Sequence, residues 1–110
     1  GKLPLWLSPE QVVVMPVTSA FDNYAEDVAK TLRAAGLTAK TDLRNEKINY
    51  KIREHSVEKI PVIMVVGAKE EADKTVTIRR LGSEKQEIMP LAEAVAALAK
   101  EAEMPHKNEA

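Results

Sequence analysis

Two apolar runs rich in β-branched residues most constrain what this chain can fold into. The runs cover Gln11–Val17 and Pro61–Val66, and neither shows the polar alternation of a strand with one wet face. Continuous apolar strands are typical of the centre of a sheet that helices cover on both sides. The longest such run, Ile60–Val66, is far too short to cross a bilayer as a helix. The sequence therefore predicts two central strands in a covered sheet.

Helical periodicity follows the first run. Ala25, Val28 and Leu32 recur at helical spacing, and Ser19 with Asp22 three residues later has the pattern of a helix N-cap. Gly36 stands where a left-handed residue usually ends a helix. We therefore expect a helix capped at its start by Ser19 and ended by Gly36.

Two further helices are expected. Asn45–Glu58 should form a short one, with Ile48 and Ile52 facing inward and Pro61 preventing its continuation. A last helix should begin at Pro90, a residue favoured at the first helical position. Its core-facing positions follow helical spacing: Leu91, Ala94, Val95 and Leu98.

The other two expected strands are less apolar. Leu37–Leu43 is more polar than the central runs, which favours a place near a sheet edge, and Thr75–Arg80 precedes a turn at Gly82. The resulting order is β-α-β-α-β-β-α, which predicts an α/β fold with a mixed sheet and helices packed on it.

Composition excludes several chemistries. The chain has 110 residues, enough for one domain, and no cysteine. The four glycines are too far apart for a phosphate-binding loop, and the two histidines, His55 and His106, lack a second ligand at metal-binding spacing. No serine lies in a nucleophile elbow. We therefore expect no catalytic residue and no metal ligand in this chain, and a cytoplasmic location.

Charge is unevenly distributed although the formal net charge is only −1. From Lys40 to Lys59 there are six basic residues against four acidic ones, whereas from Glu84 onward six acidic residues face three basic ones. A near-neutral protein with such a distribution can still present a basic face. The middle third is therefore where a basic surface is expected.

Four segments of the sequence carry a family resemblance. The run DLRNEKINYKIREH, Asp42–His55, resembles the segment after the second strand of threonyl-tRNA synthetase anticodon-binding domains, and LPLWLSPEQVVVM, Leu3–Met15, is similar to their junction with the catalytic domain. IPVIMVVGAKE, Ile60–Glu70, is similar to the central strand and the G-x-K-E turn, and Thr75–Arg80 to the next strand. The scaffold is also shared by prolyl-, histidyl- and glycyl-tRNA synthetases, but the fourteen-residue run is closer to the threonyl family.

The resemblance implies an α/β fold with a mixed sheet of about five strands flanked by three helices. It implies a linker from an absent catalytic domain at residues 1–10, the anticodon-binding domain at 11–104 and a flexible tail at 105–110. The implied function is recognition of the anticodon loop of threonine tRNA, whose unstacked bases suit sequence-specific reading. The parent would be an ATP-dependent threonine–tRNA ligase, homodimeric, with ATP, Mg and Zn bound in the catalytic domain. This fragment would be monomeric, without cofactor or membrane association, and inactive alone.

The resemblance also assigns base contacts to Asn45, Glu70 and Arg79. An amide, a carboxylate and a guanidinium supply the donors and acceptors that base edges need. The alternatives are structural: Asn45 as the N-cap of the short helix, Glu70 in a solvated turn, and Arg79 as an ordinary exposed strand residue. Arg80 should point to the opposite side of the strand from Arg79.

A second group could contact the RNA backbone or stack on a base. Lys59 lies where the family often has arginine, so a phosphate contact is expected there rather than a bidentate one. Arg44, Lys47 and Lys51 could line a phosphate-binding strip, with Tyr50 stacking on a base. The alternative is a solvated helix face with Tyr50 in the core. Two other functions remain open: the same domain in another class IIa synthetase, or a stand-alone interaction domain that has lost RNA binding.

Overall fold

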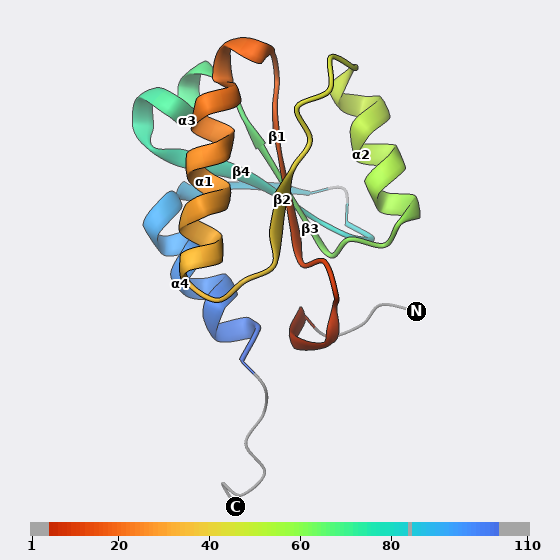
Figure 1. Ribbon diagram of the computed structural model, residues 1–110, viewed down its shortest axis with the longest axis vertical. Helices are drawn as coiled ribbons and strands as arrows, with labels where there is room; N and C mark the ends of the chain where they lie inside the picture. Colours follow the sequence, from red (N-terminus) through yellow and green to blue (C-terminus); the bar gives the residue numbers. More distant parts are fainter. Residues whose placement is uncertain (1–4, 84, 104–110) are drawn as a thin grey trace, which may run out of the picture.

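The computed structural model describes residues 5–83 and 85–103. Its elements follow the chain in the order η1, β1, η2, α1, β2, α2, β3, α3, β4, β5 and α4 (Figure 1). The expected tail at 105–110, and residues 1–4 of the expected linker, lie outside the described residues. The bounds are η1 Leu5–Leu7, β1 Val12–Pro16, η2 Ser19–Phe21, α1 Asp22–Ala34, β2 Ala39–Thr41, α2 Ile48–Val57, β3 Val62–Val66, α3 Ala68–Asp73, β4 Thr75–Arg80, β5 Gln86–Pro90 and α4 Leu91–Glu101.

The five strands form one mixed sheet in the order β2-β1-β3-β4-β5. Strands β2, β1 and β3 are parallel, whereas β4 and β5 are antiparallel to their neighbours. The predicted α/β class with a mixed sheet is therefore confirmed. The short β2 forms one edge, as the polar character of its segment indicates, and β5 forms the other.

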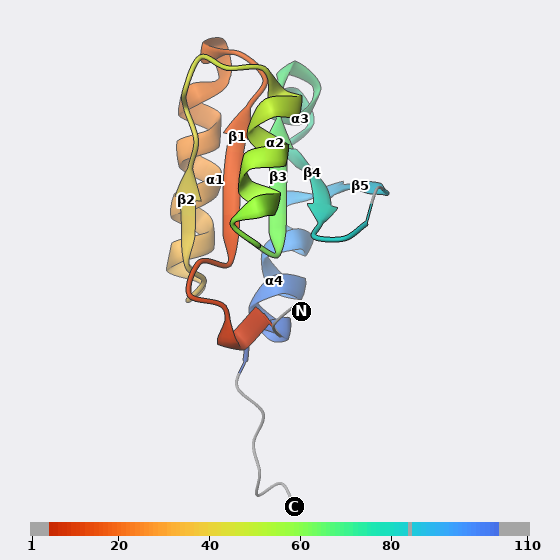
Figure 2. The ribbon, with the colours of Figure 1, turned by 90° about the vertical axis from the view of Figure 1, so that its right-hand side faces the viewer.

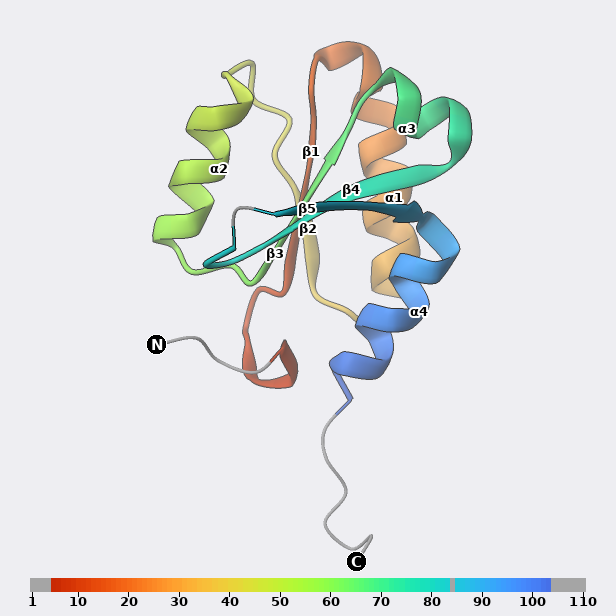
Figure 3. The same ribbon diagram turned by 180° about the vertical axis from the view of Figure 1, so that it is seen from behind.

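Helices cover the two sides of the sheet unequally. α1, α3 and α4 lie on one side and α2 lies alone on the other (Figures 1 and 3). The larger core combines α1 and α4 with every second residue of the strands, including Val12, Val62 and Val76. The smaller core combines α2 with residues of the other side, such as Val13 and Ile63. Because β1 is buried on both sides, all five of its residues are apolar.

The inward stripes of the helices are confirmed. Ile52 is buried and Ile48 is partly buried against the smaller core. In α4, Ala94 and Leu98 are buried, while Leu91 and Val95 pack at the margin of the larger core.

Several expected helix boundaries are wrong. Ser19 makes no cap hydrogen bond, because it begins a 3-10 turn that leads into α1. The short helix begins at Ile48, three residues later than the expected Asn45. Pro90 ends β5 and precedes α4 instead of beginning it. A proline tolerates this place because β5 is an edge strand and a proline has no N–H to leave unpaired.

Two elements were not expected from periodicity. The six residues Ala68–Asp73 form α3 where a turn was expected, so the described part of the chain holds four α-helices where three were expected. Gln86–Pro90 forms β5, although its residues are mostly exposed and lack a strand-like apolar pattern. Pairing with β4 supplies the backbone hydrogen bonds that its composition did not indicate.

Candidate nucleic-acid interface

Three loops meet at the carboxyl edge of the parallel strands. Val17 follows β1, the loop Asp42–Lys47 follows β2, and Gly67 follows β3. All three lie at the same end of the sheet (Figure 1). β2 and β3 lie on opposite sides of β1 in the sheet, so the strand order reverses direction between β1 and β3. The carboxyl edge at this topological switch point is where open α/β sheets usually bind ligands.

Asn45 lies exposed in the loop after β2 and lines a small hollow at this edge. The hollow measures about 30 Å³, which is room for one or two waters or a small polar group. Its lining residues are Pro16, Val17, Thr18, Ser19, Asp22, Leu43, Arg44, Asn45 and Glu46. Oδ1 of Asp22 is buried there and has no hydrogen-bond partner among the described residues. Asn45 is not the N-cap of α2, since Lys47 occupies that position.

Asp42 anchors the loop that carries Asn45. Its buried carboxylate accepts hydrogen bonds from Nε and Nη2 of Arg44 at 2.9 and 2.8 Å, and lies 2.7 Å from Nε2 of His55. The Arg44 guanidinium also pairs with Glu54 on α2. The hydrogen bonds from Arg44 hold the pKa of Asp42 far below its usual range, with His55 and the backbone N–H of Arg44 contributing. Asp42, Arg44, Glu54 and His55, all within the segment that carries the family resemblance, therefore form one ordered network.

The expectation that Lys51 lies on an exposed phosphate-binding face is wrong. Only 1% of Lys51 is exposed, and its Nζ donates to the carbonyl oxygens of Asp42 and Arg44 at 3.0 and 3.1 Å. Burial lowers its pKa. The ammonium is held by these two backbone carbonyl groups inside the protein, so it is not available to a phosphate.

Glu70 holds the start of α3. Its Oε1 accepts from the backbone N–H of Gly67 at 2.9 Å, and its Oε2 accepts from Oγ1 of Thr77 at 2.7 Å. Burial alone would raise the pKa of Glu70, but the hydrogen bonds from Thr77 and the backbone outweigh it and lower the pKa. The carboxylate is therefore ionised and held beside β4, instead of lying in a solvated turn.

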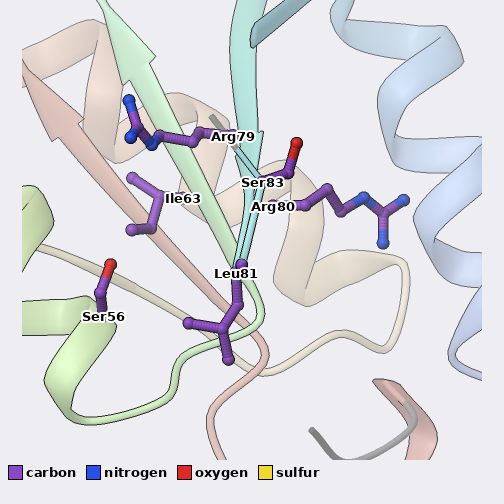
Figure 4. A pocket seen from close by; sticks show the side chains of 7 residues that line it. Ser56, Ile63, Arg79, Arg80, Leu81 and Ser83 are labelled. Carbon is purple, nitrogen blue, oxygen red and sulfur yellow. The ribbon is translucent and has the colours of Figure 1, made fainter. Parts of the chain in front are cut away.

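Arg79 lies on the side of β4 that faces away from the larger core. It pairs in register with Ile63 of β3, and α2 covers β1 and β3 but not β4 and β5 (Figure 2). Its guanidinium has no hydrogen-bond or ion-pair partner among the described residues. An open hollow of about 400 Å³ lies here, lined by Ser56, Ile63, Arg79, Arg80, Leu81, Gly82 and Ser83 (Figure 4).

Arg80 points to the opposite side of β4, as expected from strand alternation (Figure 4). Its Nη1 and Nη2 each lie 2.8 Å from a carboxylate oxygen of Glu101 on α4. The hydrogen bonds to Glu101 raise the pKa of Arg80. The two adjacent arginines therefore differ. Arg80 links α4 to the sheet, whereas the guanidinium of Arg79, on the other side of β4, remains available to a ligand.

The remaining expected contacts are spread over the ends of α2. Lys47 is exposed just before α2, and Tyr50 is 48% exposed and not in the core. Lys59 is exposed beyond the other end of the helix, which at ten residues is about 15 Å long. Asn45 and Lys59 therefore lie at opposite ends of α2, and the expected residues do not form one compact cluster.

Several residues of this surface were not expected from the sequence. Thr77 lies on the same side of β4 as Arg79 and donates a hydrogen bond to Glu70, and Ser56 lines the hollow with Arg79. Ile88, which pairs with Thr77, is 59% exposed on the same face. Strand alternation could have placed Thr77 on the side of Arg79, but no local signal indicated β5. We define the open face as Thr77, Arg79, Gln86 and Ile88. Glu70 adjoins it through its hydrogen bond with Thr77, whereas Asn45 lies apart from it, in the loop after β2.

Residues 5–83 and 85–103 contain neither a cluster of metal ligands nor a membrane-spanning helix. No group of three or more His, Asp or Glu side chains is placed to hold a metal ion. No helix there combines the length and hydropathy needed to span a membrane.

Comparison with known proteins adds sequence relatives. A threonine–tRNA ligase of Rhizobium rhizogenes is 61% identical over 105 residues, which are 96% of this chain and 16% of the relative. One of Mesorhizobium japonicum is 57% identical over 108 residues, again 16% of the relative. The chain thus spans about one sixth of the length of these relatives.

Solved structures agree with this relationship. The RNA-binding domain of threonyl-tRNA synthetase from Cryptosporidium parvum matches 91% of this chain, and the match spans 25% of that structure's chain, with a TM-score of 0.86 and 33% identity. A prolyl-tRNA synthetase of the same organism reaches a TM-score of 0.81 over 90% of this chain and 22% of its own, at 21% identity, which shows a shared fold. The family described as "Anticodon binding domain" matches residues 11–101. This chain belongs to that anticodon-binding domain family and is homologous to the corresponding region of threonyl-tRNA synthetases.

Proposed function

We propose that this domain binds the anticodon loop of threonine tRNA and serves as the recognition module of a threonine–tRNA ligase. The observation that carries the proposal is the guanidinium of Arg79, which has no partner among the described residues and lies on the part of the sheet, β4 and β5, that α2 leaves uncovered. A buried or half-buried arginine normally finds a partner in its own protein. Arg79 has none among the described residues, while its neighbour Arg80 is fully paired.

The chemistry of the open face, and of the loop that carries Asn45, suits unstacked bases. Arg79 offers paired donors, Asn45 offers both donors and an acceptor, and the carboxylate of Glu70 accepts from amino groups. Asp22 adds an unmatched acceptor in the hollow beside Asn45. Ile88 supplies an apolar surface on which a base could lie. Hydrogen bonds and stacking on unpaired bases are the usual means of sequence-specific RNA recognition.

The same proposal extends to the whole protein. The relatives that match are threonine–tRNA ligases of which this chain spans 16%. The parent would be a cytoplasmic homodimer whose catalytic domain binds ATP, Mg and Zn, and this domain would pack against that catalytic domain. These proposals rest on the homology of this chain to the ligases.

Binding to anticodon stem-loops tests the proposal. Stem-loops of threonine, proline and histidine tRNAs would be titrated with the chain and followed by fluorescence anisotropy. The threonine stem-loop should bind most tightly. Equal affinity for the three would contradict threonine specificity, preference for another would place the domain in a different class IIa synthetase, and no binding would favour an interaction domain without RNA.

The adjacent arginines provide a matched pair of variants. Arg79→Ala should weaken binding to the threonine stem-loop by about 1–3 kcal/mol. It should also reduce the difference in affinity between that stem-loop and one with a changed anticodon, as loss of a base contact does. Arg80→Ala removes the same charge from the opposite side of β4. It should leave the difference in affinity between the two stem-loops unchanged and lower the stability of the fold. Equal losses of binding in both variants would indicate a general charge effect and contradict a base contact at Arg79.

A further inference from the structure

The loop that carries Asn45 is folded into a tight turn. The backbone N–H of Glu46 donates to the carbonyl oxygen of Arg44 at 2.9 Å, which closes a three-residue turn with Asn45 at its apex. Because peptide units are planar, the orientation of the Arg44 carbonyl also sets that of the Asn45 backbone N–H. The direction of the Asn45 side chain therefore depends on what holds the Arg44 carbonyl.

Lys51 holds that carbonyl from inside the protein. Its Nζ lies 3.1 Å from the Arg44 carbonyl oxygen and 3.0 Å from that of Asp42. With the ammonium buried, these contacts are shielded from water and stronger than surface ones. The same carbonyl oxygen thus accepts from Glu46 and from Lys51, and the turn is fastened to α2.

The side chain of Arg44 fastens the loop a second time, from outside. Its guanidinium bridges Asp42 and Glu54, and Glu54 lies on α2 three residues after Lys51. Arg44 is therefore held at both its carbonyl and its side chain by the same helix.

From these contacts we infer that Lys51 is a positioning residue for base recognition: it orients Asn45 by gripping the turn at whose apex Asn45 lies, and it does not touch RNA. The inference rests on the proposed function, in which Asn45 meets a base. It assigns Lys51 and Lys47 opposite roles although both are lysines of one helix segment. Lys47 is exposed and free to meet a phosphate, whereas Lys51 acts through the protein.

Lys51→Met tests the inference, because methionine has a similar shape and no donor. Affinities for the threonine stem-loop and for a stem-loop with a changed anticodon would be measured over a range of salt concentrations. Lys51→Met should reduce the ratio of the two affinities about tenfold, within the range of one good base contact. The salt dependence should stay that of the wild type. Lys47→Met, the matched control, should lower both affinities alike and reduce the salt slope by about one.

A double variant separates positioning from a general loss of stability. Asn45→Ala alone should reduce the ratio as Lys51→Met does, and the two together should reduce it no further, because they remove the same contact. Amide hydrogen exchange of Glu46 should accelerate in Lys51→Met. An unchanged ratio in a folded Lys51→Met protein, or a salt slope lowered as in Lys47→Met, would overturn the inference.

Two outcomes are kept apart by the design. If Asn45→Ala leaves the ratio unchanged, base recognition by Asn45 is wrong, and the positioning role is overturned with it. If Lys51→Met does not fold, Glu54→Gln decides, because it weakens the exposed link between the Arg44 side chain and α2 and leaves the Arg44–Asp42 pair in place. A two- to threefold lower ratio in Glu54→Gln would then support positioning through α2, and an unchanged ratio would overturn it.

Discussion

At the scale of single residues, Asp42 shows how one side chain organises a recognition loop. Its buried carboxylate meets Arg44 and His55, and its own carbonyl oxygen accepts from Lys51. Removing the charge of the carboxylate would leave the donors of Arg44 and His55 without a charged acceptor inside the protein, which is costly. The order of the loop is therefore expected to depend on Asp42 being ionised.

Asp42→Asn should destabilise the fold by about 2–3 kcal/mol at neutral pH, through the loss of charge-assisted hydrogen bonds. Because the folded-state pKa of Asp42 is depressed, its contribution is complete above the ordinary carboxyl pKa of about 3.9 and is lost as pH falls towards the folded-state value. Urea unfolding at a series of pH values should show the difference between wild type and Asp42→Asn shrinking below about pH 4. A constant difference across that range would contradict the assignment.

At the scale of elements, α1 and α2 end in the same way with different residues. Each closes with paired hydrogen bonds from the two residues after its C-cap: Gly36 and Leu37 for α1, Lys59 and Ile60 for α2. The position after the C-cap has positive φ in both, 94° at Gly36 and 63° at Lys59. Glycine adopts this conformation without strain, and lysine does not.

Lys59→Gly should raise the free energy of unfolding by about 0.5–1 kcal/mol, because it relieves the left-handed strain. Gly36→Ala, the reverse change at the equivalent place in α1, should lower it by a similar amount, although space for the methyl group is available. Thermal unfolding of both variants measures this. If Lys59 also contacts a phosphate, Lys59→Gly should bind every stem-loop more weakly while being more stable.

At the scale of the whole molecule, the domain combines a near-neutral charge with one open sheet face. The exposed cations near that face are few, since Lys51 is buried and Arg44 and Arg80 are paired with carboxylates. Few phosphates can therefore be neutralised, and affinity for an isolated stem-loop should be modest.

Binding should weaken as salt rises, with a small slope on a logarithmic plot that reflects few released counterions. Anisotropy titrations between low and moderate salt measure it. An affinity independent of salt would contradict any phosphate contact, and a steep slope would indicate a larger basic surface than Lys47 and Lys59 provide.

The purified chain should not transfer threonine to tRNA. The chain corresponds to the anticodon-binding domain and to 16% of the length of the threonine–tRNA ligases that it matches, so we expect the aminoacylation chemistry to belong to the rest of the parent protein. A standard aminoacylation assay with threonine, ATP and tRNA checks this. Detectable charging by the chain alone would contradict the proposed division of labour.

The sequence predicted most of the scaffold. Val12–Pro16 and Val62–Val66 had to be central strands because their apolar side chains need cover on both sides, and Gly36 marked a helix end through its backbone freedom. β5 was not predicted because backbone pairing with β4 determines it, whereas its own side chains show no strand pattern. The candidate site residues were predicted from the family resemblance, which named Asn45, Glu70 and Arg79 but not how they lie relative to one another.

The residues of the segment Asp42–His55 were sufficient to indicate the family, because their identities are specific. Their roles were decided only by the tertiary structure. Lys47 and Lys51 are one helical turn apart and chemically identical, yet one is exposed and the other is buried against two carbonyl groups. Arg79 and Arg80 are neighbours, yet Arg80 is paired with Glu101 and Arg79 has no such partner within residues 5–83 and 85–103. Sequence fixes which group is present, whereas burial and partners, which depend on residues distant in the chain, determine what that group can bind.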